Sequence, residues 1–163
     1  EKAKWYNQHY LKSKSNPELT KLFQLVLKEK SISVDNLKVE KVIDLVKERA
    51  SFISDIWDQA SFFFETPAEY DKKTTKKFWK ESTPDIVNSC LKIIQKEESF
   101  TSENLEEKIK TYIESNELGF GKVMNPLRLA IVGAGKGPHL FDIMEIIGKG
   151  ETIKRLEIAL SVL

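Results

Sequence analysis

The chain has 163 residues, of which 26 are Lys or Arg and 25 are Asp or Glu, so its net charge of +1 neither indicates nor excludes a nucleic-acid partner. A hydrophobic content of 40% and a charged content of 31% are ordinary for a helix-rich globular protein. Cys90 is the single cysteine, which excludes an internal disulfide and a cysteine-based metal site and suits a reducing, cytoplasmic setting. No apolar run reaches the roughly 18 residues of a membrane-spanning helix, and the missing initial methionine leads us to expect a piece of a longer protein.

The first part of the chain predicts amphipathic helices. Apolar residues recur at spacings of three and four at Leu19, Leu22, Phe23, Val26 and Leu27, then at Val39, Val42, Ile43 and Val46, and then between Phe52 and Phe64. We expect Asn16 to cap the first of these helices, with Pro17 in its first turn, and Asp35 to cap the second. Pro67 predicts that the third helix ends near Glu65.

The rest of the chain is also helical in pattern, with no alternating strand signal and no internal repeat, so the sequence predicts an all-α fold. We expect helices to begin at Thr83, at the capping-box-like Thr101 and at Pro138, and to cover residues 123–132 and 151–160, with a C-cap at Gly148. Pro67 and a change in composition predict a division into two helical blocks near residues 65–69.

All seven glycines lie between residues 119 and 150, in a window that has no acidic residue from 118 to 141. The same window carries several basic side chains, at Lys122, Arg128, Lys136 and His139. It is therefore the place where we expect an anionic partner. The phosphate-loop pattern G-x-x-x-x-G-K-[ST] fails there, because Ala130 stands at the first glycine position and Gly137 follows the lysine. The glycines act either as joints between helices or as part of a nucleic-acid contact.

A second basic segment, DKKTTKKFWK, covers residues 71–80. Its lysines could follow a phosphate backbone, or they could form a solvated face above Phe78 and Trp79. The sequence leaves both interpretations open. The lysines that we take as candidate RNA-backbone contacts are Lys72, Lys73, Lys76 and Lys77 from this segment and Lys136 from the glycine window.

Catalytic motifs are missing from the sequence. Neither histidine belongs to an H-E-x-x-H pattern, and no G-x-S-x-G is present to hold a serine nucleophile, so we name no catalytic residue and no metal ligand. Asp142 follows His139 by three residues, which indicates a surface pair on one helix face. Cys90 lies on the apolar face of its helix and is interpreted as a small buried hydrophobe.

The glycine window also carries a recognisable pattern. The runs GKVMNPLRLA (residues 121–130) and VGAGKGPHLFDIM (residues 132–144), followed by an L-x-x-A-L motif at residues 156–160, resemble the C-terminal region of the bacterial glutamyl-tRNA synthetase family. KWYNQHYL, at residues 4–11, is similar to the segment that joins the catalytic and anticodon-binding parts in that family. The resemblance covers essentially the whole chain, in order.

The resemblance implies an all-helical anticodon-binding region with two small subdomains. Residues 1–66 would be the junction segment and the first subdomain, and residues 67–163 the second. Arg49 matches an arginine that reads the third anticodon base, and Arg128 one that contacts the anticodon bases. Pro138 and Leu140 match the loop that packs on the first anticodon base, and Trp5 matches an aromatic residue at the domain junction.

The resemblance further implies a monomer that binds tRNA(Glu) and has no role at a membrane. The parent enzyme would attach glutamate to this tRNA with ATP and Mg²⁺ bound in its catalytic domain. The family's H-I-G-H-like and K-M-S-K-S-like ATP-binding motifs are absent from these residues. We therefore expect this region to hold no cofactor and to be inactive alone. The alternative hypothesis is a helical protein-interaction module that does not bind RNA.

Overall fold

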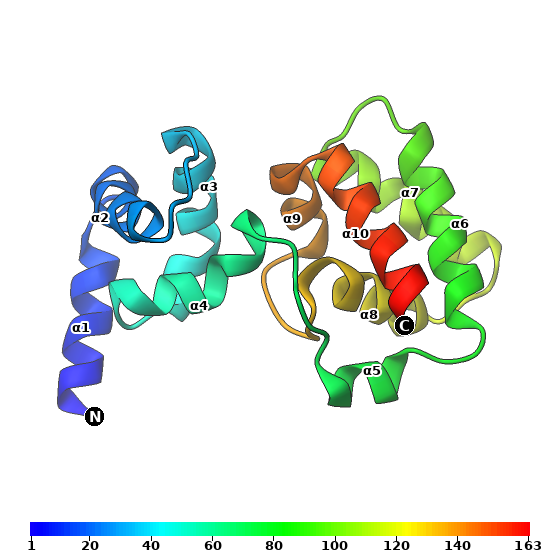
Figure 1. Cartoon of the computed structure of the whole chain (residues 1–163), viewed down its shortest axis with the longest axis horizontal. Helices are drawn as coiled ribbons and strands as arrows, with labels where there is room; N and C mark the ends of the chain where they lie inside the picture. The colour runs from blue at the N-terminus through cyan, green and yellow to red at the C-terminus, as the bar shows by residue number, and fades with distance from the viewer. The chain divides into compact units, whose positions relative to one another are not determined.

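The computed structural model describes residues 1–163 apart from the side chains of Lys4, Tyr6 and Gln8, so these positions of the early tryptophan motif lie outside the described side chains. The described residues form ten α-helices and a 3-10 turn and contain no β-strand, which confirms the predicted all-α fold. The chain divides into two compact units, unit 1 (Glu1–Glu65) and unit 2 (Thr66–Leu163), each of which can be followed in Figure 1.

Unit 1 is a cluster of short helices. Its elements are α1 (Lys2–Ser13), α2 (Asn16–Glu29), α3 (Asn36–Val46), the 3-10 turn η1 (Lys47–Arg49) and α4 (Ile53–Phe64). Helix α4 packs on both α2 and α3, which also pack on each other. The predicted apolar stripes supply the core, in which Phe23, Ile43 and Phe63 are fully buried.

Capping residues fix where the helices of unit 1 begin. Ser15, and not Asn16 as expected, caps α2, because the Ser15 hydroxyl accepts from the Glu18 backbone N–H while the Glu18 carboxylate accepts from the Ser15 N–H. This reciprocal pair satisfies two N–H groups that the helix itself leaves unbonded. Asp35 caps α3 as predicted, with its Oδ1 accepting from the Lys38 N–H at 2.9 Å. Helix α4 ends at Phe64, which confirms the predicted end near Glu65.

Unit 2 is a helical bundle around one core. Its elements are α5 (Lys72–Phe78), α6 (Thr83–Lys96), α7 (Ser102–Ser115), α8 (Phe120–Val132), α9 (Leu140–Ile147) and α10 (Lys149–Val162). Helices α6, α8 and α10 pack on one another, α7 packs on α9, and α5 packs on α8 (Figure 1). Ile94, Leu127 and Phe141 are among the fully buried core side chains.

The predicted starts at Thr83 and Thr101 are confirmed to within a residue, but three helix starts in the glycine window differ from the prediction, among them that of α10, at Lys149 instead of residue 151. Helix α8 begins three residues early, at Phe120, because Gly119 is extended and acts as its N-cap. Helix α9 begins at Leu140 instead of Pro138, since His139 still has a non-helical conformation. Gly148 ends α9 with a φ of +87°, as the C-cap prediction requires.

Across the described residues, no helix combines the length and the apolar character that crossing a membrane requires. The same part of the chain has no group of three or more His, Cys, Asp or Glu residues arranged to hold a metal ion.

Candidate nucleic-acid interface

Arg128, in the second half of α8, is tied to the loop that follows the helix. We call residues 133–139, between α8 and α9, the glycine loop. The Arg128 Nη1 donates a hydrogen bond of 2.7 Å to the Pro138 carbonyl oxygen, near the end of this loop. The Arg128 side chain is half-buried, whereas Pro138 and Leu140 are buried. The structure thus brings Arg128 and Pro138 together, and it puts the Leu140 side chain, 1% exposed, into the core of unit 2.

The glycine loop begins at a position that only glycine fits. Gly133 has a φ of +82°, and a Cβ atom there would lie 2.8 Å from the Glu69 carbonyl oxygen. The Asp71 N–H donates to the Gly133 carbonyl oxygen at 2.8 Å. Residues 66–71, which we call the strap, therefore run against the first residue of the loop through backbone contacts.

The strap leads into α5, whose lysines lie beside the glycine loop. Asp71 caps α5 by accepting from the Thr74 backbone N–H at 2.7 Å. On the loop side, a Cβ atom at Gly135 would lie 3.2 Å from the Thr74 Cγ2. Hydrogen bonds from the Thr74 side chain and backbone hold the pKa of Asp71 below its usual value, and the charges of Lys73 and Lys136 lower it further. Two lysines far apart in sequence thus act on the same carboxylate.

These contacts join the two basic regions of the sequence into one surface. We call it the basic face, and its exposed members are Lys72, Lys73, Lys76, Lys77 and Lys136. Its outer part can attract phosphate groups, because flexible ammonium groups neutralise a nucleic-acid backbone without requiring a fixed geometry. Next to it, Arg128 and the anchored loop supply planar donors and backbone groups of the kind that reads unstacked RNA bases.

The other two predicted site residues belong to unit 1. Arg49 is exposed and closes the 3-10 turn after α3. Trp5 is 65% exposed on α1, where its ring stacks on His9 with the ring centroids 5.5 Å apart. An indole with that much exposed apolar surface is suited to a partner surface, and an exposed arginine to a base or a phosphate.

His139 and Cys90 are explained by their local surroundings. The His139 Nε2 lies 3.1 Å from the Glu106 Oε2 of α7. The predicted surface pair of His139 with Asp142 is therefore wrong, because the partner of His139 is Glu106. Cys90 is fully buried, and burial raises the pKa of its thiol to about 12. A thiol with this pKa stays protonated at neutral pH, as expected for a core residue and not for a nucleophile.

Arg155, a buried arginine on α10, is a site residue that the sequence motifs do not indicate. Its side chain is 1% exposed and bonds both Glu151 and the backbone of α8. The available signal was its register, because Thr152, Arg155, Leu156 and Ala159 follow one helical stripe and are all buried. A charged residue within an apolar stripe indicates a specific partner.

The glycine loop does not fit a nucleotide cofactor. It follows helix α8 and not a β-strand, and its glycines bring the backbone close to Glu69 and Thr74 of the chain itself. These close approaches occupy the side of the loop that would have to cradle a phosphate group. We therefore do not assign the glycine loop as a site for a nucleotide phosphate.

Comparisons with known proteins identify the family of the chain. A family model described as an anticodon-binding domain matches residues 10–160. Glutamate–tRNA ligases of Flavobacterium johnsoniae and Porphyromonas gingivalis are 46% and 44% identical over all 163 residues. The crystal structure of a glutamate tRNA ligase from Elizabethkingia meningosepticum, in complex with its amino acid, aligns with a TM-score of 0.94 at 42% identity, over 98% of this chain and 32% of that chain.

The chain spans 32% of the length of these two ligases, so its similarity concerns one region of a larger protein. The matched region is the C-terminal portion of the ligases. With a family model that covers nearly all of it, this chain belongs to the family of anticodon-binding domains found in glutamate–tRNA ligases.

Proposed function

We propose that this chain recognises the anticodon loop of tRNA(Glu) as part of a glutamate–tRNA ligase. The parent enzyme would attach glutamate to the tRNA in the cytoplasm, with ATP and Mg²⁺ held by a catalytic domain outside these residues. Units 1 and 2 would be the two anticodon-binding subdomains, and Trp5 would lie at the junction with the catalytic domain. The protein would act as a monomer.

One observation carries this proposal, the contact of Arg128 with an anchored loop beside five exposed lysines. We assign Arg128 and the Pro138–Leu140 backbone to base recognition, and the basic face to the RNA backbone. Since the Leu140 side chain is buried, its contribution would come through its main chain at the start of α9. Arg49 would read a further anticodon base from unit 1.

The experiment compares binding of the full chain to an anticodon-arm hairpin of tRNA(Glu) and to hairpins with single anticodon substitutions. We expect weaker binding of the substituted hairpins by about 1–3 kcal/mol per lost base contact. Binding should also weaken as salt rises, because phosphate contacts release counterions. Equal affinity for all hairpins would contradict the proposal, and binding without any salt dependence would instead favour a protein-interaction module.

Arg128→Ala is expected to lower the preference for the native anticodon by about 1–3 kcal/mol. Part of this loss would come from the Pro138 carbonyl, which loses the hydrogen bond that fixes it. Lys122→Ala, at an exposed position in the first turn of the same helix, is the matched control and should weaken all hairpins equally and slightly. An unchanged anticodon preference in Arg128→Ala would remove Arg128 from the site.

A further inference from the structure

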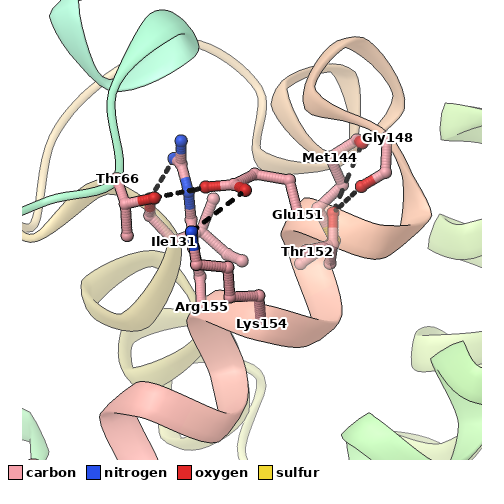
Figure 2. Close-up of polar contacts among 8 residues, drawn as sticks. All are labelled: Thr66, Ile131, Met144, Gly148, Glu151, Thr152, Lys154 and Arg155. Carbon is pink, nitrogen blue, oxygen red and sulfur yellow. Dashed lines mark hydrogen bonds and ion pairs between the residues drawn. The ribbon is translucent and has the colours of Figure 1, made fainter.

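On α10, the buried Arg155 forms an ion pair with Glu151, whose side chain is 28% exposed. The Arg155 Nε donates to the Glu151 Oε1 at 2.9 Å, and its Nη1 donates to the Ile131 carbonyl oxygen at 2.8 Å. The same Glu151 oxygen accepts from the Thr66 hydroxyl at 2.5 Å. Figure 2 shows how Arg155 reaches across from α10 while Thr66 approaches Glu151 from the strap.

The hydrogen bond to Ile131 satisfies a helix end. Ile131 is the penultimate residue of α8, so its carbonyl oxygen has no partner within the helix. A water molecule or a C-capping motif usually satisfies such a group, but here the donor is a guanidinium whose side chain is 1% exposed. Burying a charge costs stability unless its partners are well placed, and replacement by apolar residues is often neutral. The arrangement is therefore better explained by the geometry that it fixes than by stability.

The geometry that it fixes is the start of the glycine loop. Ile131 is held from α10, and two residues later the Gly133 carbonyl oxygen accepts from the Asp71 N–H of the strap. The strap is in turn bonded through Thr66 to Glu151, the partner of Arg155. The start of the loop is thus held on two sides by a closed set of contacts, while Arg128 holds its other end at Pro138.

We infer that Arg155 is a positioning residue for anticodon reading, which acts by fixing the glycine loop through Ile131 and, with Glu151 and Thr66, through the strap. The inference rests on the proposed function for its effect on RNA, but its effect on the loop is independent of RNA. Arg155 itself touches no RNA. It therefore should alter the discrimination between anticodons and leave the phosphate contacts of the basic face unchanged.

The test uses Arg155→Met in the full chain, because methionine keeps much of the length of the side chain but removes the hydrogen bonds to Glu151 and Ile131. Hydrogen exchange of the peptide that covers residues 133–139 should accelerate by about tenfold, the size expected for one lost buried hydrogen bond. The preference for the native anticodon should fall by a similar factor, while the slope of affinity against salt stays at the wild-type value. Arg155→Lys should restore part of both effects.

Lys154→Met is the matched control, since Lys154 is adjacent to Arg155 and exposed, and its ion pair, at 3.8 Å, is with Glu151 of its own helix. It should leave loop exchange and anticodon preference unchanged. If Arg155→Met does not fold, Thr66→Val and Glu151→Met decide the question by the same two measurements. Thr66→Val removes the contact of the strap with Glu151, and Glu151→Met removes that contact together with the one to Arg155.

Three results would overturn the inference. The first is hydrogen exchange of the loop at the wild-type rate in the variants. The second is an unchanged anticodon preference although the loop exchanges faster. The third is a changed slope of affinity against salt together with an equal loss of affinity for every hairpin. If the wild-type protein itself does not discriminate between anticodons, the proposed function fails, and faster exchange would still support positioning of the loop by Arg155.

Discussion

At the scale of single residues, the glycine loop depends on the positive φ of Gly133 and on the space beside it. Glycine is required there, because a Cβ atom would come too close to the backbone of the strap. Gly121, the second residue of α8, shows the opposite situation. It is helical, and the nearest atom to a Cβ at this position would be the Asn125 amide nitrogen, at the mobile end of a side chain.

Alanine substitutions at these two glycines are therefore expected to change stability in opposite directions. Gly133→Ala should destabilise unit 2, because a left-handed conformation costs about 1–2 kcal/mol for alanine and overpacking adds about 1–3 kcal/mol. Gly121→Ala should stabilise it by about 0.5–1 kcal/mol, since alanine is the better helix former. Urea denaturation of both variants measures the signs. A neutral Gly133→Ala would show that the strap is free to move away.

At the scale of elements, α5 is a seven-residue helix that carries a dense positive charge. So short a helix is marginal by itself, and it forms here with the Asp71 cap at its start and Lys80 at its end, where the Lys80 Nζ donates to the Lys76 carbonyl oxygen at 2.6 Å. Its packing against α8 then presents the lysines beside the glycine loop.

The double variant Lys73→Gln/Lys76→Gln is expected to reduce the slope of log affinity against log salt by about 0.7 for each lost phosphate contact, the value for single strands. It should weaken native and altered anticodons equally, because these lysines contact no base. Lys92→Gln/Lys96→Gln, an exposed pair on α6, is the matched control and should leave the slope unchanged. A loss of anticodon preference in the α5 variant would mean that the basic face takes part in base reading.

At the scale of the whole molecule, each unit has its own buried core. Phe23, Ile43 and Phe63 belong to unit 1, whereas Leu127 and Phe141 belong to unit 2. Compact units with separate cores are able to fold as separate cooperative steps. Tryptophans report on both, since Trp5 and Trp57 lie in unit 1 and Trp79 lies in unit 2.

Denaturant unfolding of the full chain is expected to give two transitions that do not coincide. Trp79→Phe isolates the fluorescence of unit 1, and Trp5→Phe/Trp57→Phe isolates that of unit 2. Adding Gly133→Ala should shift only the transition that Trp79 reports. Superimposable transitions, or a shift of both, would show that the units unfold as one.

The helices were predictable because their apolar residues keep a helical period, and most caps were readable from single residues such as Asp35. Ser15 and Asn16 are adjacent and both suit an N-cap, so residue type alone could not separate them. The spacing from Ser15 to Glu18 decides for Ser15, because only that spacing forms the reciprocal pair.

The meeting of the two basic regions was not predictable in the same way. It depends on a backbone bond between Asp71 and Gly133, residues whose sequence context gives no sign of mutual contact. Periodicity shows which face of a helix is buried but not which loop lies beside it. Arg155 was visible only as a charge in an apolar stripe, and its partner, a main-chain oxygen of α8, leaves no trace in the sequence.

Most of the hydrogen bonds that hold the glycine loop are accepted by main-chain oxygens, namely those of Ile131, Gly133 and Pro138. The side chains of Ala134 and Lys136, which lie between these residues, make none of these hydrogen bonds. Ala134 is half-buried and Lys136 is exposed. The loop can therefore change its chemistry without changing its shape. A library randomised at these two positions offers a starting point for changing the RNA contacts of the loop while its backbone stays in place.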